Sequence, residues 1–460
     1  MEYNVIDFFK YALPKLYIGK KLQHKNSIQF TSKIKLLLTI TILLELLTLI
    51  YFYINIFKNY SEPYSIIIFL LIIIAIYQLS WIYILISLLV IYPFQRSFEV
   101  RLIKKAVKKV NSIKDIKIIM VVGSYGKTST TNFLNTLLSY DYKVFSPNKF
   151  SEGRSINTII GISQRILKDM DSHTEILLIE AGAYKIGEIR EIAENFSPDV
   201  TIITSIGTQH LEKFKSIGNI IKAGKEAVDY SKTDATIIAP KDIYEYPFDK
   251  YNIQIEFSKN KKYIKTEYKI LDIKKNEIHF KVNKDTFKTK LLGYSMISNL
   301  TLAIECAKLF NIKNIQGKIN LISPTKRRMY PYEKDSITYI DDSYNIGEES
   351  AQSAIKFLKD MKDKNLYRNI YVATGGIVER GNESSLINKK YGELLDKSVD
   401  KILLYDSPFK NFIISGIKNK NKIINIKNIY DIENHKSEFN ENGCVLIQND
   451  ITDEYYIKNL

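Results

Sequence analysis

Cysteine is almost absent from this 460-residue chain, which carries only Cys306 and Cys444, far apart in the sequence. Two isolated thiols cannot build a disulfide framework or a thiolate zinc site, and their scarcity is typical of a reducing compartment. The sequence also lacks helix-turn-helix, RNA-binding and zinc-finger signatures. The basic first 33 residues lack the small-residue cleavage site of a signal peptide, so we expect them to be retained.

Positive charge is in excess, with 66 Lys plus Arg against 50 Asp plus Glu and a formal net charge of +16. The lysines are spread among Ile, Asn and Tyr throughout the chain, so a compositional bias with a membrane-proximal patch explains them better than a nucleic-acid partner. We therefore expect no nucleic acid partner. Hydrophobic residues make up 45% of the chain, which excludes a disordered protein and allows about three domains.

Two long apolar runs lie near the N-terminus, over residues 34–57 and 65–92. Each reaches the roughly 20 residues that a helix needs to cross a bilayer, and the short link 58–63 predicts an antiparallel hairpin. Basic residues flank both outer ends, which predicts two membrane spans with both termini on the cytoplasmic side. Glu45 in the first run is costly in hydrocarbon. A buried soluble hairpin or a re-entrant element is the alternative.

The segment Ile118–Leu134 reads IIMVVGSYGKTSTTNFL, an apolar run followed by a glycine turn and a helical pattern. Glycines allow successive N–H groups to point at one spot, where the helix N-terminus and Lys127 add positive charge. The hydroxyl of Thr128 is placed to bind Mg²⁺ on the phosphates. A strict Walker motif would have glycine where this chain has Val121. The pattern predicts a phosphate-binding loop for ATP.

Strand and helix patterns alternate after this loop, which predicts an α/β fold. We expect strands over 176–180 and 200–205 with a helix over 186–195 between them. Because ligands gather at the carboxyl ends of parallel strands, Glu180 and His210 should lie beside the loop and bind metal. Residues 250–290 are expected to form an antiparallel meander.

A second α/β unit is predicted beyond a helix over 298–310 and a linker over 311–324. Its expected strands are 337–340, 369–373, 401–405 and 444–448, and its expected helices are 349–361 and 386–395. The predicted architecture is a transmembrane hairpin (1–95), a P-loop ATPase central domain (96–322) and a C-terminal Rossmann-like domain (323–460). The glycine-rich segment Thr374–Gly381 is a candidate ligand loop or a plain strand-to-helix turn.

Several ordered motifs between Ile118 and Asp406 resemble the Mur ligases, the ATP-dependent muramyl-peptide ligases that share their core with folylpolyglutamate synthases. The motifs are GSYGKTST, Ser146-Pro147-Asn148 with Gly161-Ile162, LIEAGA, SPDVTIITSIGTQHLEKFKSIGNI, Arg328-Met329 and IDDSYN. They are most similar to the branch that adds the D-alanyl-D-alanine dipeptide. Three departures stand out: the thinned adenine motif Gly293–Asn299, Gly347-Glu348 in place of asparagine-proline, and Gly224 at the position of the carbamylated lysine.

The resemblance implies roles for individual residues. Lys127, Lys225 and His210 would be catalytic, with Lys222 as the alternative carbamylated lysine. Thr128 would bind one Mg²⁺, and Glu180 and His210 would bind a second. The implied nucleotide-binding residues are Gly123, Ser124, Gly126, Lys127, Thr128, Ser129, Asn299, Arg328, Asp342 and Asn345.

The implied activity is ATP-dependent amide formation in peptidoglycan or related cell-envelope biosynthesis. ATP would convert a substrate carboxylate into an acyl phosphate, which an amino-acid or dipeptide amine would then attack. Family members that use soluble UDP-linked substrates carry an N-terminal domain for the uridine diphosphate, and here a membrane hairpin stands in its place. We therefore expect a lipid-anchored or membrane-surface substrate. A folylpolyglutamate-type ligase and a nucleotide-sensing membrane scaffold are the alternatives, and two spans disfavour a transporter ATPase.

Overall fold

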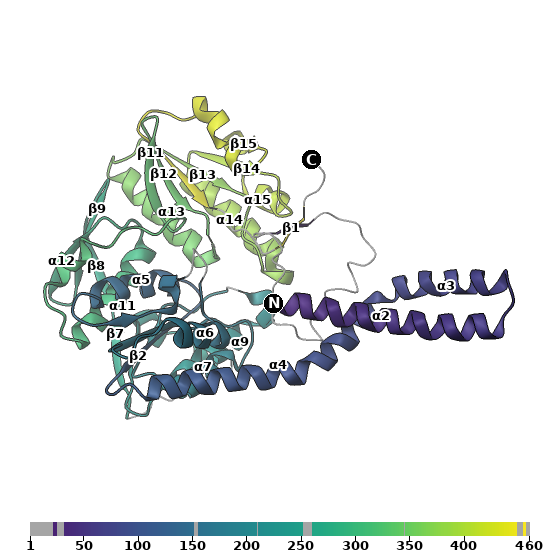
Figure 1. The fold of residues 1–460 in the computed structure, drawn as a ribbon. Helices are drawn as coiled ribbons and strands as arrows, with labels where there is room; N and C mark the ends of the chain where they lie inside the picture. The colour runs from purple at the N-terminus through teal and green to yellow at the C-terminus, as the bar shows by residue number, and fades with distance from the viewer. Residues whose placement is uncertain are drawn as a thin grey trace. The chain divides into compact units, whose positions relative to one another are not determined.

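A computed structural model describes residues 22–24, 32–150, 155–208, 210–251, 260–344, 346–448 and 454–456 (Figure 1). The chain divides into two compact units, the first including the described residues up to Leu102 and the second beginning at Ile103. A short antiparallel pair, β1 (Leu22–His24) with β17 (Glu454–Tyr456), belongs to the first unit. Asn345, one of the predicted nucleotide-binding residues, lies outside the described residues.

The first unit is built from three consecutive helices: α2 (Ser32–Asn59), α3 (Tyr64–Gln78) and the start of α4 (Ser80–Asn111). Thr41 Oγ1 on α2 donates a hydrogen bond of 3.0 Å to Ser87 Oγ on α4. The ring of Phe69 on α3 lies 5.5 Å from that of Tyr53 on α2, measured between centroids. The predicted apolar hairpin is therefore present as a three-helix arrangement.

The single second span predicted over 65–92 is wrong, because the helix is interrupted at Leu79. Across the interruption, Ser80 Oγ donates to the carbonyl oxygen of Ile76 at 3.2 Å. By length and composition, two helices could cross a membrane, Ile34–Asn59 and α4, whereas α3 is shorter. A core helix of a soluble protein or a signal sequence can meet the same criterion.

The central domain of the second unit is organised around a six-stranded parallel sheet in the order β3-β4-β2-β5-β6-β7. Side chains of β2 alternate between its faces, so Ile119 and Val121 join one buried cluster and Ile118 and Met120 the other. The strands are β2 (Lys117–Val122), β3 (Val144–Phe145), β4 (Ile176–Glu180), β5 (Val200–Ile203), β6 (Thr236–Pro240) and β7 (Lys262–Thr266).

Helices cover both faces of this sheet, as a doubly wound fold requires (Figure 1). The C-terminal part of α4 packs Ile103, Ala106 and Val110 against one face. The helices are α5 (Lys127–Leu138), α6 (Ile159–Asp169), α7 (Glu188–Phe196), α8 (Leu211–Phe214), α9 (Ile217–Asp229), α10 (Lys241–Tyr244), α11 (Tyr294–Leu309) and α12 (Ile315–Ile319), with 3₁₀ turns at Pro147–Phe150 and Phe248–Tyr251.

The meander predicted over 250–290 is confirmed for β8 (Tyr268–Lys274), β9 (Glu277–Val282) and β10 (Asp285–Thr289), which pair antiparallel. The preceding strand β7 instead joins the parallel sheet beside β6. The linker predicted over 311–324 contains the short helix α12. Its N-cap residue, Asn314, accepts a hydrogen bond from the N–H of Gly317 at 3.1 Å.

The C-terminal domain contains a second six-stranded sheet, in the order β11-β12-β16-β13-β14-β15, in which only the edge strand β11 is antiparallel to its neighbour among the described strands. All four predicted strands and both predicted helices are present. The elements are β11 (Tyr330–Lys334), β12 (Ile337–Asp342), α13 (Glu348–Asp363), β13 (Asn369–Thr374), α14 (Ser384–Ser398), β14 (Lys401–Tyr405), α15 (Lys410–Gly416), β15 (Ile423–Ile426) and β16 (Gly443–Gln448), with 3₁₀ turns at Gly381–Glu383, Lys420–Lys422 and Ile429–Glu438.

Candidate active site

The phosphate loop turns directly from β2 into α5, as the sequence predicts. Its backbone is fixed by the segment that follows β5: the N–H of Ser124 donates to the carbonyl oxygen of Ser205 at 3.1 Å, and the N–H of Tyr125 donates to Ser205 Oγ at 2.8 Å. Ser124 Oγ also exchanges hydrogen bonds with the backbone of Gly207, at 2.9 and 3.1 Å. The loop is therefore held in one conformation by the neighbouring strand end.

Both loop glycines are required by close approach as well as by backbone conformation. Gly123 and Gly126 have φ values of 138° and 84°, a region that side-chain-bearing residues rarely adopt. A Cβ on Gly123 would lie 2.2 Å from Thr204 Oγ1, and one on Gly126 would lie 2.3 Å from Asn299 Oδ1. Asn299, predicted to bind the nucleotide, therefore lies directly against the phosphate loop.

Lys127 opens helix α5, and its ammonium group covers the loop. Its Nζ donates to the carbonyl oxygens of Gly123 at 2.5 Å and Ser124 at 3.1 Å. Burial lowers the pKa of Lys127 to about 8, while the nearby carboxylate of Glu180 acts in the opposite direction. Ser129, the last residue of the predicted loop set, is buried with its hydroxyl turned away from solvent.

Thr128 and Glu180 converge beside the loop, although the resemblance assigns them to two different Mg²⁺ ions. Glu180 is only 2% exposed at the end of β4, where its Oε1 accepts from Thr128 Oγ1 at 3.1 Å and its Oε2 from Asn148 Nδ2 at 2.6 Å. Thr128 Oγ1 also lies 2.9 Å from Ser155 Oγ. A buried carboxylate with a hydroxyl alongside supplies the oxygen ligands that Mg²⁺ prefers, so this donor set fits the ion.

His210 is held by the C-terminal domain: its Nδ1 lies 2.7 Å from Glu379 Oε2. Burial lowers the pKa of His210, although the hydrogen bond and charge of Glu379 oppose that shift. Burial would raise the pKa of Glu379, but the hydrogen bond with His210 and the charges around it bring the net pKa below its usual range. The described residues contain no group of three or more His, Cys, Asp or Glu side chains placed to hold a metal. The role of His210 as a metal ligand stays a prediction.

The two candidate lysines for a carbamate lie on α9. Lys225 Nζ forms a two-pronged ion pair with Asp229, at 2.7 Å to each carboxylate oxygen, on the same helix. Lys222 is exposed one turn earlier. The catalytic role of Lys225 therefore stays a prediction, since this contact is a local helical pair.

Two predicted nucleotide-binding residues of the C-terminal domain, Arg328 and Asp342, lie near each other in the structure. The guanidinium of Arg328 lies 4.2 Å from the ring centroid of Tyr344, and its charge contributes to the lowered pKa of Lys127. Asp342 Oδ1 accepts from the N–H of Met329 at 3.2 Å. Burial raises the pKa of Asp342 to about 7, against opposing effects from Met329 and Arg328. Arg328 and Asp342 are thus positioned by one local network.

Three contributors were missed by sequence reasoning. Asn148 was quoted in a motif without a role, yet it connects Glu180 to the N–H of Ile156, which donates to Asn148 Oδ1 at 2.6 Å. Thr204 bonds to the carbonyl oxygen of Tyr125 and fixes the loop. Glu379 was included only in the candidate loop Thr374–Gly381. An acidic residue in that candidate ligand loop was the only sequence signal that could have indicated a partner for His210.

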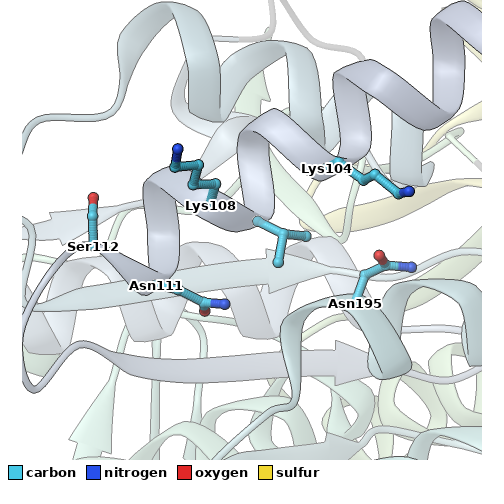
Figure 2. Close-up of a pocket in the computed structure, with 6 residues that line it drawn as sticks. Lys104, Lys108, Asn111, Ser112 and Asn195 are labelled. Carbon is cyan, nitrogen blue, oxygen red and sulfur yellow. The ribbon is translucent and has the colours of Figure 1, made fainter.

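A separate surface hollow of about 500 Å³ lies between α4 and α7, lined by Lys104, Val107, Lys108, Asn111, Ser112 and Asn195 (Figure 2). Asn195 Nδ2 donates a hydrogen bond of 2.8 Å to the carbonyl oxygen of Glu191. Lys104 and Lys108 are exposed on one face of α4. The hollow shares no lining residue with the phosphate loop, so it is not part of the candidate active site.

Residues 121–307 match the Mur ligase middle domain. This segment is a Mur ligase domain. Over 301 residues the chain is 26% identical to the UDP-N-acetylmuramoyl-tripeptide–D-alanyl-D-alanine ligase of Bacillus subtilis, covering 63% of this chain and 62% of that protein. It is 29% identical over 301 residues to the enzyme of the same name from Buchnera aphidicola, covering 62% of this chain and 63% of that protein.

The fold agrees with that assignment. The MurF ligase from Thermotoga maritima in complex with ADP superposes with a TM-score of 0.65 at 21% identity, covering 76% of this chain and 80% of that structure. The chain spans only 62–63% of the length of the two curated relatives. The Mur ligase fold is therefore established, whereas the reaction of the whole protein is a proposal.

Asp342 of the Mur ligase fold provides a pH-dependent prediction. Its folded pKa of about 7 lies above the ordinary 3.8, so the folded chain binds the proton more tightly than the unfolded chain. Between pH 4 and 7 this group should therefore cost stability as pH rises. We expect Asp342→Asn, which keeps the acceptor oxygen, to be of the order of 1–3 kcal/mol more stable relative to the native chain at pH 8 than at pH 4.

The measurement is chemical denaturation of both chains across that pH range, with unfolding of the second unit monitored at each pH. A constant difference in stability between the native and Asp342→Asn chains from pH 4 to 8 would contradict the prediction.

Proposed function

We propose that this chain is an ATP-dependent ligase of cell-envelope biosynthesis, which activates a carboxylate and joins it to the amine of an amino acid or dipeptide. The observation that carries the proposal is the convergence of Lys127, Thr128 and Glu180 within a Mur ligase fold. The names of the relatives support peptidoglycan precursors as the substrate class.

In the proposed reaction, the loop N–H groups and Lys127 bind the β- and γ-phosphates of ATP. The γ-phosphoryl group moves to the substrate carboxylate, forming an acyl phosphate and ADP. The amine then attacks the acyl carbon, and phosphate leaves as the amide forms. Thr128 and Glu180 would hold Mg²⁺, which neutralises charge on the transferring phosphoryl group when bound.

We further propose that the first unit anchors the chain in a membrane, with the Mur ligase domain facing the cytoplasm. Large apolar side chains remain exposed along α2 and α3, among them Leu47, Tyr51 and Leu71. A soluble surface rarely carries so many contiguous apolar groups. Lys108 and Lys109 belong to the basic end of α4, on the side expected to face the cytoplasm.

A membrane-bound enzyme favours a substrate that is also at the membrane. The described residues of the first unit include helices α2 and α3 and the start of α4. We therefore propose that the carboxylate substrate is lipid-linked and is presented at the bilayer surface. The amine is drawn from solution.

The test compares ADP release by the full chain in lipid vesicles with a soluble nucleotide-linked precursor and with a polyprenyl-linked precursor. We expect turnover with the lipid-linked form to be at least about 10-fold higher, because both reactants are confined to one surface. Equal or faster turnover of the soluble form would contradict the lipid-linked substrate while leaving ligation intact. ATP binding without amide formation from either precursor would favour a nucleotide-sensing scaffold.

A further inference from the structure

The side chain of Tyr125, in the phosphate loop, reaches across to the C-terminal domain. Its ring packs between two glycines, one from each domain. A Cβ on Gly207 would lie 2.9 Å from Tyr125 Cε2, and a Cβ on Gly347 would lie 1.8 Å from Tyr125 Oη. The φ of Gly347 is −125°, which any residue can adopt, so glycine is needed there to make room for the tyrosine.

Arg380 meets the same hydroxyl from the other side. Its Nη2 donates to Tyr125 Oη at 3.0 Å and to the carbonyl oxygen of Ile346 at 3.3 Å. Arg380 is 2% exposed, and its buried Nε has no hydrogen-bond partner among the described residues. A guanidinium is costly to bury when its donors are incompletely paired. This arrangement therefore depends on the surrounding contacts that bring the two domains together.

The preceding residue, Glu379, forms a second contact between the domains through His210. The backbone of the same residue accepts a hydrogen bond from the N–H of Glu212, at 3.5 Å. Consecutive residues of one C-terminal loop thus touch two different loops of the central domain. Glu349, on α13, is a further residue of the C-terminal domain that lies close to the central domain. A Cβ on Gly207 would lie 3.1 Å from Glu349 Oε2.

We propose that Tyr125, Gly347 and Arg380 form an interdomain latch, through which closure of the C-terminal domain is transmitted to the phosphate loop. The three are positioning residues: Tyr125 is fixed to the loop backbone, Arg380 holds its hydroxyl, and Gly347 provides the space for its ring. When the domains separate, Arg380 regains water, so the burial cost of its charge makes the latch reversible. Nucleotide bound at the loop adds contacts that favour closure.

The latch extends the proposed function, since closure would position the reactants of ligation, but it can be tested without any ligation. The native thiols of Cys306 and Cys444 are buried, so fluorophores can be directed to Tyr140→Cys in the central domain and Leu386→Cys in the C-terminal domain, both at exposed positions. Energy transfer in the full chain with and without Mg²⁺-ADP then reports closure.

We expect Tyr125→Phe, which keeps the ring and removes the hydroxyl, to lower the ratio of closed to open chains by about 10-fold. Gly347→Ala should open the domains most strongly. Tyr125→Ala in that background removes the clash and should restore closure to about the level of Tyr125→Phe, because the hydroxyl that Arg380 binds is also lost. Lys168→Ala, at an exposed site on α6, is the matched control.

Unchanged energy transfer in Tyr125→Phe and Gly347→Ala, with normal folding by circular dichroism, would overturn the latch. If Tyr125→Ala does not rescue closure in the Gly347→Ala chain, Gly347 does not serve to make room for the ring of Tyr125. For an active ligase, the same variants should raise the KM for the amine. They should also weaken ADP binding by up to about 10-fold, because a nucleotide that favours closure binds more weakly when closure is disfavoured. Absence of ligation by the native chain, with normal closure on Mg²⁺-ADP, would instead argue against the proposed function and leave the latch intact.

Discussion

Lys127→Ala should reduce ATP turnover and amide formation by about 1,000-fold, because it removes the cation that binds the β- and γ-phosphates in the proposed reaction. The fold should survive the change. Burial lowers the pKa of Lys127 to about 8, which means that the folded chain holds this charge at a free-energy cost. The melting temperature should therefore stay the same or rise.

The measurement is steady-state ADP release beside a thermal unfolding curve on the same preparation. Lys168→Ala removes an exposed lysine of the same domain and should leave both quantities unchanged. Retained turnover in Lys127→Ala would show that this loop does not bind the phosphates of ATP. A large fall in melting temperature would show that Lys127 has a structural role that its burial does not suggest.

Glu180→Gln is expected to have the second largest effect, lowering turnover by about 100-fold at a fixed Mg²⁺ concentration. The substitution keeps the shape of the side chain and an acceptor for Thr128, but it removes the negative charge that suits Mg²⁺. Part of the lost activity should return as the Mg²⁺ concentration is raised, because weaker binding can be offset by mass action.

The Mg²⁺ dependence of the rate is the decisive measurement. Glu194→Gln provides a matched control, since Glu194 forms only a surface ion pair with Arg190 on α7. An unchanged Mg²⁺ dependence in Glu180→Gln would remove Glu180 from the metal site. Loss of folding would be detected by circular dichroism, and Glu180→Asp would then test the charge at the same position.

Local patterns in the sequence were sufficient to predict the phosphate loop and the strands on either side of it. Strand β4 ends at Glu180 as expected, because a continuous apolar run followed by a polar residue is a local signal. The break at Leu79 was missed, since no glycine or proline marks it within an otherwise uniform apolar segment.

Most of the site features that could not be predicted from the sequence are contacts between segments far apart in the chain. Glu379 lies 169 residues from His210, and Arg380 lies 255 residues from Tyr125, so no spacing rule connects them. Their pairing depends on how two sheets are brought together. The space beside Gly347 was equally hidden, because a glycine in a turn usually indicates backbone conformation, whereas here it accommodates a remote aromatic ring.

The strand order of the C-terminal sheet has a consequence for synthesis of the chain. Strand β16, at Gly443–Gln448, lies between β12 and β13, which come about 100 and 70 residues earlier. A nascent chain that has not yet emerged beyond residue 442 thus has two separate half-sheets, each with an unpaired edge. On the ribosome, the central domain can complete its sheet while the C-terminal domain remains in two parts. Only the arrival of β16 joins them, so the domain that carries Arg380 becomes complete after the central domain.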